Sequence, residues 1–449
     1  MDLVVRSERV VLPDGERPGS IHIADGVIRA VRAADDVGDA PLVDAGNLVV
    51  MPGLVDTHVH VNEPGRTDWE GFETATRAAA AGGVTTIVDM PLNSLPSTCD
   101  AAALGAKHAA AAGKCWVDVG FWAGAVPGNL SDLQPLHEGG VMGFKCFLCE
   151  SGVAEFPYVT PEQLDGIVAE VARLDALLIV HAELAAPLAA VTVEPGVPSQ
   201  DYRSWLLSRP REAEDRAVDL LVALGRRHGA RLHVVHLASA SAVDALRAAQ
   251  AEGVRISAET CPHYLHFAAE WVPDGATEYK CAPPIRGEAN RRLLWSALAE
   301  GVISMVVTDH SPSPPDMKCR SSGAFPCAWG GISSLQLGLP VVWSGSMARG
   351  GGQPSDIARW MARGPADLVG LSHKGRIAEG CDADLVVWDP AGTQVISAEQ
   401  LEHRHPMTPY EGERLHGVVH QTWLRGRLVF DRGRWSAGPS GRLLSRGEA

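Results

Sequence analysis

The sequence lacks the features of secreted, membrane-spanning and disulfide-rich proteins. Its nine cysteines are scattered over 449 residues and are odd in number, which argues against a disulfide framework. No apolar run approaches the ~20 residues that a membrane-spanning helix needs. The opening segment MDLVVRSERVVLPDGE has charges within its apolar stretch, unlike a signal peptide. We therefore expect a cytoplasmic protein with no membrane partner.

Positive charge is also scarce. The chain has 39 Lys and Arg against 54 Asp and Glu, which gives a formal net charge of −15, and no basic block occurs. Nucleic acids and anionic surfaces are bound by clustered cations, so we expect neither as a partner. Hydrophobic residues make up 46% of the chain and charged residues 21%, a composition that predicts a folded core and excludes disorder.

The middle of the chain repeats one pattern eight times. Short apolar runs alternate with Ala-rich segments whose apolar residues recur every three or four positions, as in amphipathic helices. The apolar runs are 48–58, 83–91, 116–124, 140–148, 176–183, 231–239, 254–262 and 302–310. Strand–helix repetition favours a parallel sheet covered by helices, and eight repeats predict a (β/α)₈ TIM barrel. The alternative, an open doubly wound sheet, lacks a GxGxxG motif after its first strand.

The two ends of the chain have a different texture. Both consist of short strand-like pieces separated by Gly, Asp and Pro. Because the termini of a domain often lie close together, these pieces can pair with each other. We predict a barrel over 49–372 and one small β-sandwich domain formed by 1–48 and 373–449.

Polar residues follow several of the apolar runs. In a TIM barrel the ends of these strands converge on the C-terminal face, where active sites lie. The residues are His58, His60, Lys145, His181, His236 and Asp309. Any one of these histidines alone is more often a hydrogen-bonded core residue than a ligand, and Asp309 alone could cap a turn. Together, four histidines and a carboxylate form a donor set that suits Zn²⁺ or a similar metal.

Lys145 stands in an otherwise apolar strand, GFKCF. A buried ammonium is costly unless it is paired, so Lys145 either reaches solvent, pairs with Glu150 or Glu183, or loses its proton. A neutral amine can react with CO₂ to give an anionic carbamate, which could bridge two metal ions.

Other cysteines and histidines are not predicted to bind metal. Cys146 and Cys149 form a CxxC with no second pair nearby, so we interpret them as structural. His403 and His405 repeat the HxH spacing but follow no apolar run, which predicts a surface position. His263 and His266 are expected near the pocket, and His233 is expected to face away from the site.

Eight short motifs are distributed over nearly the whole chain, namely PGLVDTHVH, GFKCF, VHAE, VHLAS, TCPHY, CAPPIR, TDHSP and GRIAEGCDADLVVWD. With them the chain resembles the cyclic-amidohydrolase branch of the amidohydrolase superfamily. Within that branch it is most similar to the allantoinases. The segments that carry this likeness are EPGRTDWEGFET, DMPLNSLPST, GFKCFLCESGVAEFP and TDHSPSPPDMK.

The resemblance implies a function and a set of site residues. It implies two divalent metal ions, one held by His58, His60 and Asp309 and the other by His181 and His236, with a carboxylated Lys145 bridging both. Asp309 would act as general acid and base while allantoin is opened to allantoate, a step of purine catabolism. The substrate contacts implied by resemblance are Asn62, Asn93, Ala282 and Ser311. A homotetramer is usual in this branch.

Three alternatives stay open. Dihydroorotases usually place an Arg two positions after the second histidine, where this chain has Asn62, and Arg66 nearby is expected to pair with Asp68 or Glu70. Hydantoinases and dihydropyrimidinases usually place a Tyr five positions after the lysine, where this chain has Glu150; nor is Glu150 the small residue expected in an allantoinase. A non-catalytic scaffold would lack metal ligands, whereas all six positions are filled.

Overall fold

Eight parallel strands form the centre of the computed structural model, which describes residues 1–191 and 196–447. The strands pair in sequence order, with β8 and β9 together supplying the third position, and a bridge between Val59 and His310 closes the ring. Their bounds are β6 Leu54–Val59, β7 Val84–Asp89, β8 Asp118–Phe121, β9 Ala123–Gly124, β10 Phe144–Phe147, β11 Leu177–His181, β12 Arg231–Val234, β13 Ile256–Thr260 and β14 Met305–Val306. The predicted (β/α)₈ barrel is confirmed.

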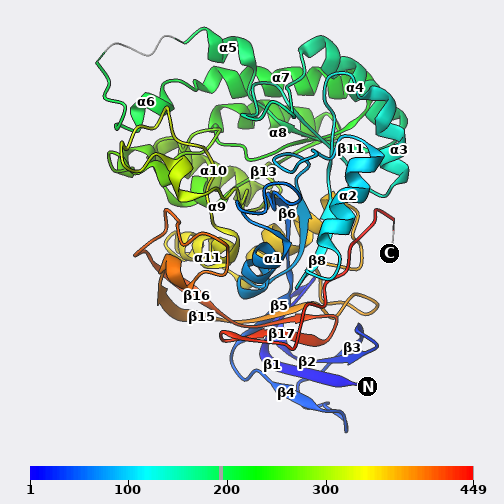
Figure 1. Cartoon of the computed structure of the whole chain (residues 1–449). Helices are drawn as coiled ribbons and strands as arrows, with labels where there is room; N and C mark the ends of the chain where they lie inside the picture. Colours follow the sequence, from blue (N-terminus) through cyan, green and yellow to red (C-terminus); the bar gives the residue numbers. More distant parts are fainter. Residues whose placement is uncertain (192–195, 448–449) are drawn as a thin grey trace.

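Helices cover the outside of this barrel, as Figure 1 shows. They are α1 Phe72–Ala81, α2 Ala101–Ala111, α3 Leu133–Glu138, α4 Pro161–Arg173, α5 Ala185–Ala189, α6 Arg203–Leu206, α7 Arg211–His228, α8 Val243–Ala251, α9 Pro262–His266 and α10 Glu288–Glu300. After β14 come α11 Gly338–Met347, α12 Pro354–Ala358, the π-helical turn η7 Arg359–Arg363 and α13 Gly364–Leu368. The strands are buried on both faces, which is why their sequences are almost continuously apolar.

The start of α4 illustrates how the sequence sets helix boundaries. Thr160 accepts a hydrogen bond from the Gln163 backbone N–H, and the Gln163 side chain accepts one from the Thr160 N–H. This capping box satisfies two donors that a helix N-terminus leaves unpaired, and Pro161 at the first helical position loses no bond there. The helix therefore begins where the sequence places these three residues.

A nine-stranded sheet combines both ends of the chain and lies below the barrel in Figure 1. Its strands are β1 Leu3–Leu12, β2 Gly15–Ala24, β3 Val27–Arg32, β4 Leu42–Asp44, β5 Val49–Pro52, β15 Leu385–Val395, β16 Arg414–Leu424, β17 Arg427–Asp431 and β18 Arg434–Trp435. N-terminal and C-terminal strands meet where β5 pairs antiparallel with β15. The predicted association of the two ends is thus seen directly.

The first predicted apolar run, 48–58, is divided between the two sheets. Val49–Pro52 forms β5 of the nine-stranded sheet, and Leu54–Val59 forms the first barrel strand. Gly53 lies between them at a point where a Cβ atom would come within 2.3 Å of the Thr85 side chain. A residue without a side chain therefore lets the chain pass from one sheet to the other. The domain boundaries at 48/49 and 372/373 stay a prediction.

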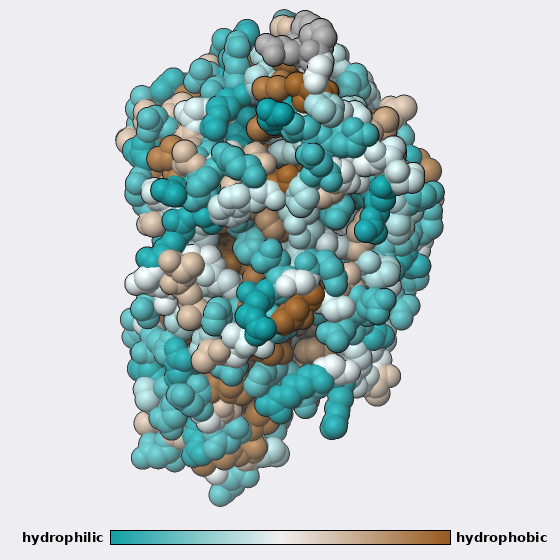
Figure 2. Space-filling model, turned by 90° about the vertical axis from the view of Figure 1, so that its left-hand side faces the viewer, coloured by the Kyte–Doolittle hydropathy of each residue, from teal (hydrophilic) through white to brown (hydrophobic). Residues whose placement is uncertain are grey.

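The outer surface is mostly polar. In Figure 2 hydrophobic residues form small groups among hydrophilic ones on the face shown. Within residues 1–191 and 196–447, no helix has both the length and the apolar character needed to cross a membrane.

Candidate metal centre and active site

A cavity of about 320 Å³ lies at the C-terminal ends of the barrel strands. All six predicted metal ligands line it, namely His58, His60, Lys145, His181, His236 and Asp309. They come from five different strands or the turns that follow them. The barrel therefore brings together side chains that are far apart in the sequence, at the face where this fold holds active sites.

His58, His60 and Asp309 form one group of donors. The Asp309 Oδ1 atom lies 3.1 Å from His58 Nε2 and 3.5 Å from His60 Nε2. One donor atom from each of the three lies within 4.8 Å of the others. Burial would raise the pKa of Asp309, but the adjacent His58 and the hydrogen bonds from both imidazoles hold it well below its usual value. Asp309 is thus an anion that faces two imidazoles. The three side chains together form a donor set suited to a divalent cation.

His181 and His236 form the second group. His181 Nδ1 and His236 Nε2 are 3.0 Å apart, and both rings are buried. The other nitrogen of His181, Nε2, lies 2.8 Å from Glu183 Oε2. If Nε2 carries the proton toward Glu183, the lone pair of Nδ1 faces His236 and is available to a metal ion. The ring of Phe147 stacks on His181 with centroids 4.6 Å apart and fixes its plane.

Lys145 has no hydrogen-bond or ion-pair partner within the described part of the chain, although it is only 1% exposed. Neither Glu150 nor Glu183 pairs with it; Glu183 is engaged by His181 and Arg209. Burial lowers the pKa of Lys145 to about 8, an effect that Asp309 and Glu259 partly offset. A neutral form of the amine is therefore accessible near physiological pH, and the amine lies among the candidate metal ligands.

Glu259 is a site residue that the sequence reasoning missed. It is the penultimate residue of β13, and its Oε1 atom lies 2.5 Å from His58 Nδ1 while Oε2 lies 2.9 Å from His233 Nε2. Burial would raise the pKa of Glu259, but His58 and His233 lower it to about 2. The carboxylate thus orients His58 so that Nε2 points toward Asp309. A signal is present in the sequence, because Glu259 is a charged residue near the end of the strand-like run ISAET, as the candidate ligands are in theirs.

His233 itself does not line the cavity, and both of its ring nitrogens are engaged. Nδ1 lies 2.7 Å from Ser257 Oγ and Nε2 contacts Glu259. Its role is to hold Glu259 rather than to bind an ion.

The structure places three of the four predicted substrate contacts at the cavity. Asn93, Ala282 and Ser311 line it. The Ser311 hydroxyl donates to Asp309 Oδ1 at 2.9 Å, which ties it to that carboxylate. Asn62 does not line the cavity; it is fully buried and its Nδ2 approaches the Pro312 carbonyl at 3.5 Å. Its backbone has a φ of 66°, so the alternation of a strand does not extend to this residue.

Arg66 forms an ion pair with Glu155, not with Asp68 or Glu70 as predicted, and donates to the Asn93 carbonyl at 2.7 Å. The partner expected from sequence was wrong because it was chosen among neighbours in the chain, whereas Glu155 arrives from the loop after β10. Arg66 is therefore held outside the ring of cavity-lining residues.

The predicted surface position of His403 is wrong. Its side chain is buried, and its ring lies 5.5 Å from that of His310. Burial lowers the pKa of His403 to about 4, so the imidazole is neutral. His405 is half-buried, and its Nε2 lies 2.7 Å from the Asp68 carbonyl. The polar tail folds back over the loop after β6, a contact that local polarity cannot reveal.

Four other cysteines and histidines considered in the sequence analysis do not line the cavity, namely Cys146, Cys149, His263 and His266. Cys146 and Cys149 are buried and unbonded to each other, and Arg209 Nη2 approaches Cys149 Sγ at 3.5 Å. His263 is buried close to Asp309, with one donor atom from each and from Cys261 within 4.8 Å of one another, but it does not line the cavity. His266 lies farther out, 3.6 Å from Glu413.

The sequence of residues 49–429 matches the family described as "Amidohydrolase family". The chain belongs to the amidohydrolase family. It is 52% identical over 448 residues to the allantoinase of Streptomyces avermitilis, with 99% of each chain covered. It is also 42% identical to the allantoinase of Arabidopsis thaliana, covering 98% of this chain and 90% of that one. The predicted resemblance to allantoinases is confirmed.

Solved structures of similar fold are cyclic-amide hydrolases. The L-hydantoinase (dihydropyrimidinase) from Arthrobacter aurescens superposes with a TM-score of 0.92 at 29% identity, covering 99% of this chain and 100% of that chain. The dihydropyrimidinase from Brevibacillus agri gives a TM-score of 0.89 at 28% identity, with 99% of each covered. Family and fold together identify the chain as a cyclic amide hydrolase.

Proposed function

We propose that this chain hydrolyses allantoin, opening its ring to give allantoate. The observation that supports this most strongly is the meeting of six donor side chains around one cavity in a chain whose relatives are named allantoinases. A non-catalytic scaffold would have no reason to keep all six at the same face.

The donors fit two divalent metal ions, for which we propose Zn²⁺. Four buried imidazoles, one carboxylate and an unpartnered amine are a poor hydrogen-bonding set but a good ligand set. His58, His60 and Asp309 would hold one ion, His181 and His236 the other, and a carbamate formed on Lys145 would contribute to both. When bound, such ions lower the pKa of water toward ~7 and polarise a substrate carbonyl.

Asp309 is the general base and acid of the reaction. The oxygen of water bonds to the ring carbonyl carbon, and Asp309 accepts the proton that this water loses. The carbon–nitrogen bond of the ring then breaks, and Asp309 delivers the proton to the leaving nitrogen. The adjacent imidazoles keep Asp309 ionised, so it can accept a proton at neutral pH. Proton transfer of this kind contributes roughly 10²- to 10⁴-fold to the rate.

The preference for a neutral over an anionic substrate depends on whether the cationic side chains at the cavity are free to bind a carboxylate. Arg209 and Lys280 line it, but Glu183 engages Arg209, and Lys280 donates to the carbonyls of Pro326 and Ala328. Both cations already have acceptors, so the exocyclic carboxylate of dihydroorotate would lack a dedicated partner. Allantoin is neutral, and its ureido arm can bind amide, hydroxyl and backbone groups such as those of Asn93, Ser311 and Ala282.

A ring-opening assay across allantoin, hydantoin, dihydrouracil and dihydroorotate tests this function. We expect kcat/KM for allantoin to exceed that for dihydroorotate by at least about a thousandfold, since an unpaired buried carboxylate costs several kcal/mol. Comparable values would overturn the substrate assignment and leave the metal site standing. A preference for hydantoin or dihydrouracil would instead assign the chain the activity named for its structural neighbours.

A role in purine catabolism, a homotetrameric assembly and a cytoplasmic location stay predictions. One relative, from Aquarana catesbeiana, is named "Allantoinase, mitochondrial".

A further inference from the structure

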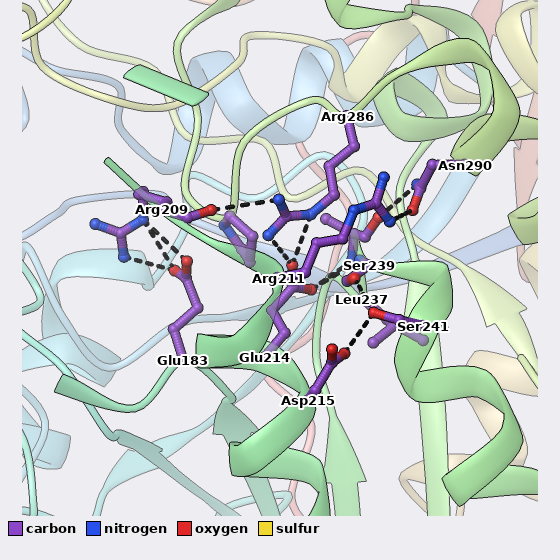
Figure 3. Close-up of polar contacts among 12 residues, drawn as sticks. Glu183, Arg209, Arg211, Glu214, Asp215, Leu237, Ser239, Ser241, Arg286 and Asn290 are labelled. Atoms are coloured by element: carbon purple, nitrogen blue, oxygen red, sulfur yellow. Dashed lines mark hydrogen bonds and ion pairs between the residues drawn. The ribbon is translucent and has the colours of Figure 1, made fainter. Parts of the chain in front are cut away.

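Two buried ion pairs join the loops that carry His181 and His236 (Figure 3). Glu183, two residues after His181, is bound by Arg209 through Nε at 3.0 Å and Nη2 at 2.5 Å. Glu214 of α7 is bound by Arg286 through Nε at 3.0 Å and Nη2 at 2.5 Å. Glu183 is fully buried, and Glu214 is 2% exposed. Both carboxylates are therefore shielded from water, and their ion pairs are screened less by salt than surface pairs, although Arg209 is 14% exposed where it lines the cavity.

The two pairs are connected to each other. Arg286 Nη1 donates to the backbone carbonyl of Arg209 at 3.3 Å, as Figure 3 shows. At one end, Glu183 Oε2 lies 2.8 Å from His181 Nε2. At the other end, Glu214 Oε2 accepts the backbone N–H groups of Ala238 and Ser239 at 3.0 and 2.9 Å. Those two residues directly follow Leu237 and His236, so the path leads from one candidate ligand to the other.

The backbone at His236 gives an independent reason for such support. His236 has a φ of 40°, in the left-handed region that non-glycine residues seldom adopt. Such a conformation is strained and persists only where the surroundings fix it. Glu214 holds the two N–H groups just beyond this residue, and the Asn290 amide donates to the Ala238 carbonyl at 2.8 Å. The loop is thus fixed on both sides of the Ala238 peptide unit.

We infer that Glu183–Arg209 and Glu214–Arg286 act as one brace that sets the distance and orientation between His181 and His236. These four are positioning residues. Glu183 selects the His181 tautomer that presents Nδ1, and Glu214 holds the loop that presents Nε2 of His236. The inference rests on the proposed function, in which these two nitrogens, 3.0 Å apart, share one metal ion.

The test uses the full chain and removes the remote pair without leaving a lone buried charge. Breaking one partner of a buried pair is strongly destabilising, whereas replacing both is often tolerated, so the variant is Glu214→Met with Arg286→Met, which also removes the acceptor of the Ala238 and Ser239 N–H groups. Zn²⁺ affinity is measured by competition with a chromophoric chelator. The matched control is Lys374→Met with Asp382→Asn and Asp384→Asn, a buried charge cluster below the barrel in which Asp118 keeps Arg425 as its partner.

We expect the wild type and the control to bind two Zn²⁺ per chain, and the Glu214/Arg286 variant to bind one of the two 10- to 100-fold more weakly. Glu183→Gln should weaken the binding of the same Zn²⁺ ion, and kcat should fall by a larger factor than KM changes. Two ions bound with wild-type affinity in both brace variants, whatever the change in Tm of the metal-free protein, would overturn the brace. A wild type that binds no Zn²⁺ would instead overturn the proposed metal centre.

Discussion

Lys145 and Lys374 are both buried to 1% exposure, yet their surroundings are opposite. Lys374 lies beneath the barrel, where Nζ contacts Asp384 at 2.7 Å, Asp118 at 2.8 Å and Asp382 at 2.9 Å. Burial would lower the pKa of Lys374, but these carboxylates raise it above its usual value. Lys145 has no such partner among the residues that the structure describes, and burial lowers its pKa to about 8.

This difference separates a structural lysine from a chemical one. A buried cation with carboxylate partners keeps its proton and links the barrel to the nine-stranded sheet, since Asp118 begins β8 and Asp384 precedes β15. A buried amine with no partner among the described residues can lose its proton and react. The same residue type thus has carboxylate partners at one end of the barrel and, under the proposed function, supplies chemistry at the other.

The largest effect is expected from Lys145→Ala. Without the carbamate, both ions lose a shared ligand, so we expect metal content to fall and kcat/KM to drop by at least ~10³-fold. Metal analysis and the ring-opening assay measure this. Short carboxylic acids added to the variant should partly restore both quantities, since they can fill the space left by the side chain. An alanine variant with normal metal content and rate would refute the carbamate.

Lys374→Met should lower the stability of the fold and leave metal binding and activity nearly unchanged, the reverse of Lys145→Ala. It leaves three carboxylates without their shared cation, so we expect the free energy of unfolding to fall by about 3–5 kcal/mol. Denaturant unfolding measures this loss. Metal content and kcat of the folded protein should stay within about twofold of the wild type, and a selective loss of metal would show that the two clusters are not independent.

Asp309→Asn removes the base while keeping the shape of the side chain. We expect the rate of ring opening to fall by at least ~10²-fold with the fold retained. Steady-state kinetics and the far-ultraviolet circular dichroism spectrum check the two halves of this statement. A near-normal rate with two ions bound would remove the catalytic role of Asp309.

The smallest expected effect concerns a third buried lysine, Lys318, whose acceptors are the carbonyls of Trp329 and Gly331 at 3.0 and 2.5 Å. Burial lowers its pKa to about 7, with smaller effects from Cys281, Lys280 and Glu278. The folded chain therefore releases this proton more readily than the unfolded chain. Between pH 7 and 10.5 the unfolded state binds more protons, so stability rises with pH across that window.

Lys318→Met should remove the part of the pH dependence of stability that Lys318 causes. The free energy of unfolding of the wild type relative to the variant should increase by roughly 1–3 kcal/mol from pH 7 to pH 10. Thermal or denaturant unfolding over that pH range provides the measurement. A difference that is flat, or that shrinks as pH rises, would show that Lys318 keeps its proton in the folded state as Lys374 does.

The sequence predicted those parts of the site that the strand pattern determines. His181 and Asp309 directly follow apolar runs, so the barrel alone requires them to meet. Asn62 was placed by counting from His60, but its positive φ ends the alternation, and the side chain is buried away from the cavity. His403 was assigned to the surface from its polar neighbours, whereas its burial depends on packing against the barrel, near His310. Such long-range contacts leave no local pattern in a single sequence.

¹³C NMR of protein reconstituted with Zn²⁺ and ¹³C-labelled bicarbonate tests directly whether Lys145 carries a carbamate. A carbamate on Lys145 should give one signal per chain in the active wild type, and this signal should be retained in Lys374→Met and lost in Lys145→Ala. An active wild type with no carbamate signal, or a signal that survives in Lys145→Ala, would contradict this assignment.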